Sequence, residues 1–231
     1  MPDYRDFDKL NILIKIEGIL INEAPLRIGI GKEPPLGSPI DIAIYRINNK
    51  PCIPGSSLKG LFRSFLESLL ASEGYNVHPP YDDERIKEEL EKKDFCEICG
   101  IFGNTELASH VRIYDSYART THTFQKTGTS IDREFGSVKA GALFTEELVV
   151  PNVEWDFRMD IINIKIYPEP DHGDKRVKLL QSLINTLSTI GLNIGSRKSV
   201  GHGLIKLKKA KWFAYKVEDG LFKKIGEGDI S

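Results

Sequence analysis

The sequence predicts an α+β fold in which two helices pack on one face of an antiparallel sheet. In residues 10–21 and 157–167, apolar and polar side chains alternate, as in strands with one buried face. Residues 58–69 and 180–190 carry apolar side chains three and four positions apart, as amphipathic helices do. The order strand, helix, strand, long hairpin, strand, helix, strand is that of a ferredoxin-like (RRM-like) core with insertions.

We expect one domain over residues 1–231, because a chain of this length with 40% hydrophobic residues can bury a single core. The core is predicted from two parts, about 8–73 and about 150–215. An inserted helical, zinc-type lobe is expected at about 74–112, and a long hairpin at about 114–150.

Charge and cysteine content limit the class of protein. The 32 basic and 33 acidic residues give a formal net charge of -1, so any nucleic-acid site must be a local basic patch. Three cysteines are too few for a disulfide framework and fit a reducing compartment. Since no stretch of about twenty uninterrupted apolar residues occurs, we expect a cytoplasmic protein that does not engage a membrane.

The first strand is predicted over residues 10–21, where isoleucines alternate with Lys15 and Glu17. The next segment, 23–39, is rich in proline and glycine, which a regular helix or central strand does not tolerate. It should be a long functional loop, followed by a short strand over 40–47.

The first helix should follow the segment IPGSSLKG, with Ser56 as its N-cap after the turn at Pro54 and Gly55. Lys59 and Arg63 lie four residues apart, off the apolar stripe, and would be available to a ligand. The stripe consists of Leu58, Leu61, Phe62, Phe65, Leu66 and Leu69.

The second half of the predicted core repeats this order. A strand over 157–167 has Ile162, Ile164 and Ile166 on its buried face. The second helix ends near Gly191, and the segment LIKLKKAKW closes the sheet. One face of this helix should carry Leu180, Leu183, Ile184, Leu187 and Ile190.

Two segments could bind phosphate groups. In PGSSLKG, free backbone N-H groups at a helix N-terminus would lie beside Lys59. In GSRKSVGHG, Arg197, Lys198 and His202 lie among glycines that let a ligand come close to the backbone. Taken alone, each segment is more simply explained as an ordinary helix cap or turn. In the predicted fold both lie at helix termini, where they could meet and form a basic site.

Cys96 and Cys99 form a C-x-x-C, which offers two thiolates at zinc spacing but lacks a second such pair. His78 and His110 are the histidines within reach along the chain, and His78 is the ligand that we expect to complete a structural zinc site. A reduced, metal-free turn remains open, and Cys52 is predicted to be a core residue.

Two long segments together resemble the RAMP superfamily of CRISPR proteins. These are PIDIAIYRINNKPCIPGSSLKG and GSRKSVGHG, with CEICGIFG and TGTSIDR between them in the order that the family has. Within the family, the sequence is most similar to the multi-copy backbone subunit of type III effector complexes. The resemblance implies that guide RNA, target RNA, copies of itself and other effector subunits are the partners, and that the role is antiviral defence.

The resemblance implies that Asp41, before the short strand, is the residue required to cut target RNA. The implied reaction is metal-dependent attack of a ribose 2'-hydroxyl on the adjacent phosphate. A carboxylate can hold Mg²⁺ or Mn²⁺, while water and phosphate oxygens supply the other ligands. From the residues alone, an ordinary loop aspartate is the simpler interpretation of Asp41.

The resemblance also implies a thumb-like hairpin that splays a nucleotide between guide and target. Ile131 would insert between bases and Arg133 would bind phosphate. A surface ion pair between Asp132 and Arg133 is the simpler alternative.

Two other functions remain open. The chain could be a structural RNA-binding paralogue that leaves cleavage to another subunit. It could also be a metal-independent guide-processing ribonuclease that uses two of His110, His122 and His202 as acid and base.

Overall fold

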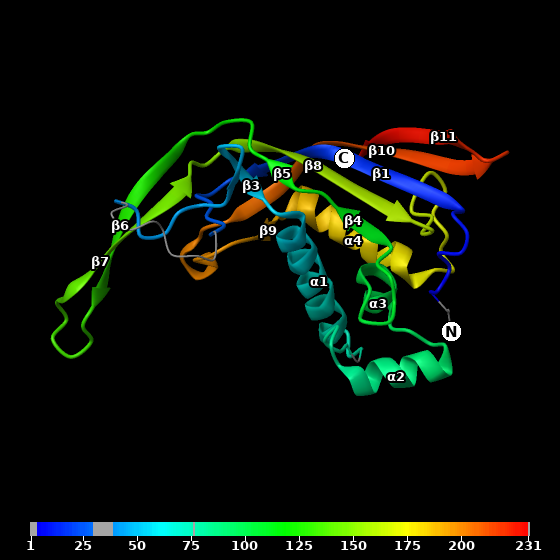
Figure 1. The fold of residues 1–231 in the computed structure, drawn as a ribbon, viewed down its shortest axis with the longest axis horizontal. Coiled ribbons are helices and arrows are strands. Elements are labelled where there is room, and N and C mark those ends of the chain that lie inside the picture. Colours follow the sequence, from blue (N-terminus) through cyan, green and yellow to red (C-terminus); the bar gives the residue numbers. More distant parts are fainter. Residues whose placement is uncertain (1–3, 30–38, 76, 231) are drawn as a thin grey trace.

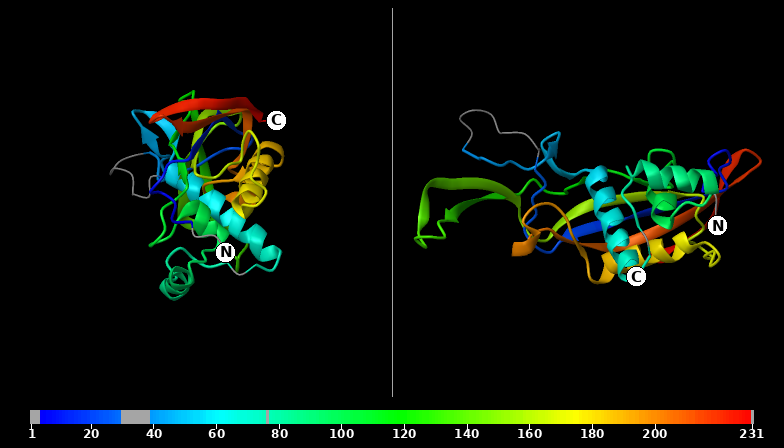
Figure 2. Two further views of the ribbon diagram at one scale, coloured as in Figure 1. Left: turned by 90° about the vertical axis from the view of Figure 1, so that its right-hand side faces the viewer. Right: turned by 90° about the horizontal axis from the view of Figure 1, so that it is seen from below.

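A six-stranded antiparallel sheet is the main feature of the computed structural model, which describes residues 4–29, 39–75 and 77–230 (Figure 1). Two helices, α1 and α4, lie on one face of this sheet (Figure 2), which confirms the predicted α+β class. Five strands follow the order β11 (Leu221–Ile230), β10 (Leu204–Glu218), β1 (Ile12–Asn22), β8 (Val153–Ile162) and β4 (Val111–Ile113), and the short β9 (Leu192–Asn193) pairs with β10.

The central strand β1 forms as its alternation predicts, because Ile14, Ile16 and Leu20 are all fully buried. The predicted bounds of β8 are wrong, because this strand begins at Val153 and ends at Ile162. Two later isoleucines, at 164 and 166, are buried although they lie outside the strand. The chain turns at Asn163, which adopts a φ of 55°. Buried isoleucines therefore continue past the end of the strand, and the apolar alternation in the sequence extends further than β8 itself.

The helices α1 (Gly55–Ser72) and α4 (Lys175–Thr189) each bury one stripe of side chains. In α1 the stripe is spaced four residues apart, and Phe62 reaches the sheet through an edge contact with Phe157 at 6.3 Å. The prediction for Ile190 is wrong: its side chain is 72% exposed, because α4 ends one residue earlier.

The predicted N-cap of α1 is also wrong. The helix begins at Gly55, and no side chain caps it from the preceding Pro54. The N-H of Gly55 donates instead to Oδ1 of Asp115 at 2.8 Å, and this carboxylate also suits the positive end of the helix dipole. A Cβ on Gly55 would overlap the carbonyl oxygen of Ile113, so close packing requires glycine here.

The lobe between α1 and β4 contains α2 (Asp83–Lys92) and α3 (Glu97–Phe102). Asp82 caps α2 by accepting a hydrogen bond from the N-H of Arg85. Arg176 of α4 donates to the carbonyl of Gly100 at 3.2 Å, and the ring of Tyr4 packs against both this arginine and Gly100. The start of the chain therefore fastens α3 to α4.

A second, three-stranded sheet contains β2 (Arg46–Ile47), β3 (Lys50–Ile53) and β5 (Ser116–Tyr117). The predicted strand over 40–47 is thus shorter than expected, and a loop carries residues 39–45. Cys52 is buried in β3, as predicted. Most of the loop predicted over 23–39 lies outside the described residues.

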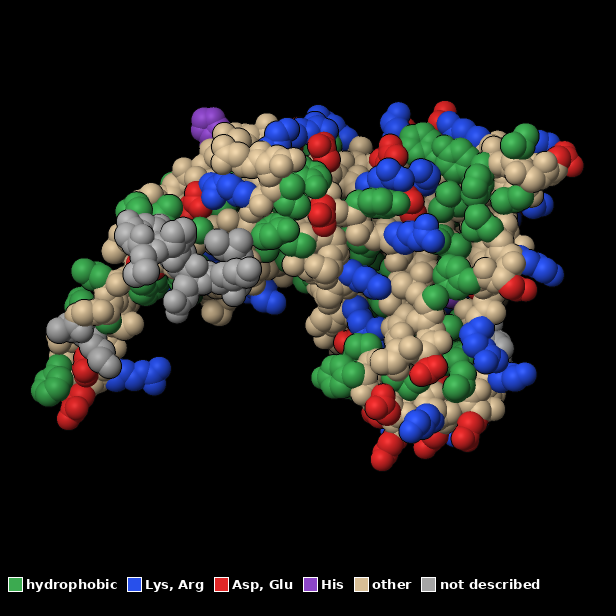
Figure 3. Space-filling model, viewed as in Figure 1, with side chains coloured by type: hydrophobic (Ala, Val, Ile, Leu, Met, Phe, Trp, Pro, Cys, Tyr) green, Lys and Arg blue, Asp and Glu red, His purple; other side chains and the backbone are tan. Residues whose placement is uncertain are grey.

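A two-stranded hairpin, formed by β6 (Thr123–Ile131) and β7 (Val138–Val149), projects from the body of the molecule (Figure 1). It lies inside the range where the sequence predicts a hairpin. Figure 3 shows a hollow between the tip of the hairpin and the helical lobe. Among the described helices, none has the length and hydrophobicity that crossing a membrane requires.

The sheet continues further than predicted, because β10 runs to Glu218 and returns as β11. The turn consists of Asp219 and Gly220, both with positive φ, and Asp-Gly is a common two-residue hairpin turn. The indole of Trp212 lies against Gly226 and Gly228 of β11. On this indole, the ring of Tyr167 stacks with its centroid 4.9 Å away.

We predict that Gly228→Val destabilises the protein by about 1–3 kcal/mol, the usual cost of overpacking. A Cβ at this position would lie 2.8 Å from Nε1 of Trp212, so the indole must move. Chemical denaturation measures the change in the free energy of unfolding. Leu221→Ala is the control in the same strand: its side chain is 68% exposed, and a change below about 0.5 kcal/mol is expected. Equal losses in the two variants would contradict the packing argument.

Candidate nucleic-acid interface and metal centre

The two predicted basic segments meet in the structure. They line opposite sides of a pocket of about 350 Å³. The first three turns of α1 form one side, and the end of β9 with the loop that follows it forms the other. The α1 side consists of Ser57, Gly60, Leu61 and Ser64, and the loop side of Asn193, Ile194, Gly195 and Lys198.

Each of the two segments carries a lysine without an acidic partner among the described residues. Lys198 is exposed at the start of a short 3-10 helix, η1 (Lys198–Val200). Lys59 does not line the pocket; it is half-buried in α1, where burial and the nearby Arg63 cation lower the pKa of its amine. Within the described part of the chain, neither lysine takes part in an ion pair. A phosphate group would supply the missing negative charge.

Two other predicted residues are already engaged inside the protein. The N-H of Gly55 donates to Asp115. The guanidinium of Arg63 donates to Glu67 and to the carbonyl of Gly103, both at 2.7 Å. These groups are therefore engaged within the protein, and RNA binding by Gly55 and Arg63 stays a prediction. The helix face of Arg63 packs towards α3, which the periodicity of α1 does not reveal.

Arg197 belongs to a cluster at the base of the hairpin. Its Nε lies 3.0 Å from Oε2 of Glu146, a carboxylate with a fully buried side chain. The same oxygen lies 2.9 Å from Nη1 of Arg27. The guanidinium of Arg197 also lies over the ring of Phe144, 5.0 Å from its centroid. Two cations share one carboxylate, so the cluster keeps a net positive charge.

The predicted histidines do not form an acid–base pair. His202 is buried, and burial together with the Lys126 cation lowers its pKa, so a neutral imidazole is favoured at neutral pH. Burial also lowers the pKa of His110, whose Nε2 lies 2.7 Å from Asp6. His122 is exposed in the segment before β6.

Asp41 is exposed and docked against β7. Its Oδ2 accepts a hydrogen bond from the N-H of Thr145 at 2.5 Å, and its own N-H donates to the Thr145 carbonyl at 2.9 Å. Within the described part of the chain, the other carboxylate oxygen has no hydrogen-bond partner. The carboxylate thus lies beside Thr145, the residue that precedes Glu146 in β7.

The loop that carries Asp41 is held by a second buried carboxylate, Glu147. This carboxylate accepts hydrogen bonds from Arg46, from the hydroxyl of Thr123 at 2.8 Å and from the N-H of Ile44 at 3.3 Å. Burial alone would raise the pKa of Glu147, but the hydrogen bonds from Arg46 and Thr123 outweigh burial and lower it. The glutamate therefore stays ionised and anchors residues 41–46.

The hairpin tip presents both predicted residues to solvent. Ile131 is 67% exposed, and Arg133 is exposed as well. The carboxylate of Asp132 accepts hydrogen bonds from the N-H groups of Glu134 and Phe135. Among the described ion pairs none joins Asp132 to Arg133, so the alternative of a surface ion pair is wrong.

Four side chains of the inserted lobe form a candidate metal centre: His78, Glu89, Cys96 and Cys99, whose ligand atoms lie within 4.8 Å of one another. The Nε2 of His78 lies 3.4 Å from Sγ of Cys96 and 3.6 Å from Sγ of Cys99. In a tetrahedral zinc site, ordinary bond lengths place nitrogen and sulfur about 3.6 Å apart. The donor set therefore fits zinc.

The surroundings also suit a metal. The Nδ1 of His78 lies 3.0 Å from the carbonyl of Pro79, an arrangement that leaves Nε2 free to bind a metal. A hydrogen bond from Cys96, assisted by His78 and Arg63, lowers the pKa of Cys99 against the effect of burial. One oxygen of Glu89 is buried without a partner among the described residues. A metal ion would bind both the thiolate and this carboxylate.

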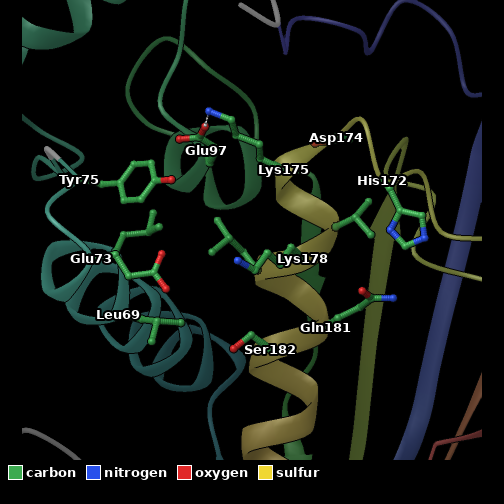
Figure 4. Close-up of a pocket in the computed structure, with 13 residues that line it drawn as sticks. Leu69, Glu73, Tyr75, Glu97, His172, Asp174, Lys175, Lys178, Gln181 and Ser182 are labelled. Atoms are coloured by element: carbon green, nitrogen blue, oxygen red, sulfur yellow. Dashed lines mark ion pairs between the residues drawn. The ribbon is translucent and has the colours of Figure 1, made fainter.

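A separate cavity of about 420 Å³ lies between α1 and α4 (Figure 4). The ion pair between Lys175 and Glu97, at 3.2 Å, lies on its rim, and Tyr75 faces α4 across it. None of the predicted site residues lines this cavity, so it is not part of the basic site.

Several site residues were missed by the sequence analysis. Glu146 and Glu147 are adjacent acids in an apolar strand segment, ALFTEELVV, and this was a usable signal, since strands rarely bury charge without partners. Glu89 lies three residues after the buried Ile86, and so on the inner side of α2. The partners Arg27 and Arg46 carried no local signal.

Comparison with known proteins gives two findings. A family model described as the RAMP superfamily matches residues 23–206, which is more than half of the chain. The chain is also 27% identical over 213 residues to a Methanocaldococcus jannaschii protein named CRISPR system Cms endoribonuclease Csm3, a match that covers 85% of this chain and 79% of that protein. The family match includes both segments of the pocket and the whole of β7.

Proposed function

This chain belongs to the RAMP superfamily, and we propose on that basis that it binds guide RNA as a backbone subunit of a type III CRISPR effector complex. The Csm3-like relative supports this role through its name. The observation that carries the proposal is the pocket between α1 and the loop after β9, which brings the two basic segments together and which Lys198 lines. Copies of the chain and other effector subunits would then follow one another along the guide.

The phosphate contacts of this proposal come from Lys59, Lys198 and Arg197. Arg133 would add a contact at the hairpin tip, where the exposed Ile131 could insert between bases of guide and target. His202 would line the site as a neutral group. Gly55 and Arg63 would support α1 from inside.

We further propose that Asp41 serves in cutting target RNA. Its carboxylate faces solvent and is oriented by Thr145, so it could hold Mg²⁺ or Mn²⁺, with water and phosphate oxygens as the other ligands. Such an ion, when bound, offsets negative charge on the phosphate. A nucleotide splayed by Ile131 could align its 2'-hydroxyl with the scissile phosphate beside Asp41.

The strand order supports a ferredoxin-like core within a single domain. The strands β10-β1-β8-β4 with the crossover helices α1 and α4 match the order of that fold. One hydrophobic cluster includes side chains from Ile14 to Ala214, which favours one domain over 1–231 with the lobe and the hairpin as insertions.

We propose a structural zinc ion at His78, Glu89, Cys96 and Cys99. The four donors and their spacing support this assignment. The ion would tie α2 to α3 and, through Arg63 beside Cys99, to α1.

A structural paralogue without cleavage activity is the second candidate function. The observation that favours it is that Asp41 is the sole carboxylate of its loop within the described part of the chain, residues 39–45. A metal-independent ribonuclease is not favoured, because His110 and His202 are buried and have lowered pKa values.

We predict that Lys59→Ala and Lys198→Ala each weaken binding of single-stranded guide RNA. Each removes one phosphate contact, so the slope of log affinity against log salt should become shallower by about 0.7. Fluorescence anisotropy at several KCl concentrations measures both quantities. Lys216→Ala, an exposed lysine at the far end of β10, is the matched control and should leave the slope unchanged. Equal effects of all three variants would rule out a specific site.

A further inference from the structure

β7 carries two adjacent glutamates whose side chains are almost fully buried. The side chain of Glu146 is 0% exposed and that of Glu147 is 7% exposed. Neighbouring side chains of a strand point to opposite faces, so the two carboxylates contact different parts of the protein. Burying an ionised carboxylate is costly unless it is paired. The partners of each glutamate therefore indicate what it stabilises.

The partners of Glu146 belong to the basic loop. Arg27 and Arg197 share its Oε2, at 2.9 Å and 3.0 Å. Arg27 also donates to the hydroxyl of Ser196 at 2.6 Å, and its carbonyl accepts from the Ser196 N-H at 3.1 Å. On β6, Lys126 lies opposite Glu146. The carboxylate thus holds two guanidinium groups side by side within a positively charged surrounding.

The partners of Glu147 belong to the loop of Asp41. Its carboxylate binds Arg46 and the N-H of Ile44, and its own N-H donates to the carbonyl of Ile42 at 2.9 Å. Together with the two hydrogen bonds between Asp41 and Thr145, these contacts of Glu147 hold the whole segment 41–46 along β7. This pair is balanced, because one arginine meets one carboxylate.

We propose that Glu146 and Glu147 are positioning residues with separate roles. Glu146 orients Arg197, together with Arg27, towards phosphates of the guide. Glu147 holds the loop of Asp41 in place for cutting of the target. The inference rests on the proposed function. It adds that one strand, β7, sets the distance between Arg197, which binds the guide, and the carboxylate of Asp41.

The two roles follow from which nitrogen atoms of the paired arginines remain available for another partner. Arg197 uses Nε for Glu146, and its terminal nitrogens have no hydrogen-bond partner in the described part of the chain. They can therefore bind a phosphate while the carboxylate fixes the plane of the guanidinium. Arg46, in contrast, uses both terminal nitrogens on Glu147, so it serves the loop rather than RNA.

The test compares Glu146→Gln with Glu147→Gln in the assembled complex, each being the matched control for the other. For Glu147→Gln we expect cutting at saturating target to slow by about tenfold or more, since small misplacements of reacting groups are costly. Guide affinity and target affinity should stay within about twofold.

For Glu146→Gln we expect the reverse pattern: guide affinity falls about fivefold because the two arginines lose their common anchor, and cutting by guide-loaded complexes is kept. A higher guide affinity would overturn the role proposed for Glu146, since this carboxylate would then only compete with phosphate for the two arginines. Equal losses of binding and cutting in both variants would mean that the glutamates serve stability alone and would overturn the whole inference.

Milder variants keep the test decisive if a glutamine variant does not fold, which circular dichroism reports. Thr123→Ala removes one hydrogen bond to Glu147 and should slow cutting alone. Ser196→Ala removes one contact of Arg27 and should weaken guide binding alone. Asp41→Ala in the same assay separates a failure of the proposed function from a failure of this inference. If the Asp41→Ala variant cuts normally, the proposed function fails. If it does not cut while Glu147→Gln cuts normally, only this inference fails.

Discussion

Replacing Asp41 by alanine should reduce cutting of complementary RNA in the assembled complex by about 10²–10³-fold, the usual cost of removing one charge-stabilising group from a reaction centre. The reason is that the carboxylate faces solvent and is already oriented by the N-H of Thr145. Guide binding should be unchanged, because Asp41 is not among the residues of the basic pocket. Single-turnover cleavage and guide anisotropy measure the two effects.

Two further variants separate charge from structure. Asp41→Asn keeps an acceptor for Thr145 but removes the negative charge, so it should be as inactive as the alanine variant. Asp171→Ala is the matched control, because this exposed aspartate also accepts a backbone hydrogen bond, from Gly173 at 2.9 Å. Full activity of Asp41→Asn would show that no charge or metal is needed at this position, and the chain would then be the structural paralogue.

Removing the metal centre should have the largest effect on stability. Cys99→Ser is expected to release about one zinc ion per chain and to lower the Tm by roughly 10 °C, because a loss of several kcal/mol has this effect in a domain of this size. Metal analysis by mass spectrometry and a thermal scan provide the measurements. The same shift should follow when a chelator strips the unmodified protein.

The control for this experiment is Cys52→Ala, a buried cysteine in β3, away from the cluster. It should keep the full zinc content. Glu89→Gln should keep the fold but bind zinc more weakly, since one of four ligands is neutralised. If the purified protein contains no zinc and its Tm is insensitive to chelator, the cluster is held together by the thiol and imidazole hydrogen bonds alone.

Local patterns predicted the helices and the central strand well. The four-residue spacing of Phe62 and Leu66 identifies the buried stripe of α1 because neighbours along the chain determine it. β11 was missed, since most of its side chains are exposed and leave no apolar alternation. The end of β8 was misplaced because burial continues beyond the turn at Asn163.

The site was harder to predict than the fold because its contacts are long-range. The two basic segments were identified by composition, and their meeting could be inferred from the helix order. Whether a cation faces solvent or a protein partner could not be inferred, as Arg63 demonstrates. Glu146 pairs with an arginine 119 residues away and Glu147 with one 101 residues away, and such distances leave no trace in local periodicity.

The charged junction at the base of the hairpin has a consequence for warm conditions. Keeping ions out of water becomes less costly as temperature rises, whereas the gain from burying hydrocarbon levels off. The two buried carboxylates and their three arginines therefore grow in relative importance on heating. As the protein approaches melting, the geometry around β7 should be among the last features to loosen.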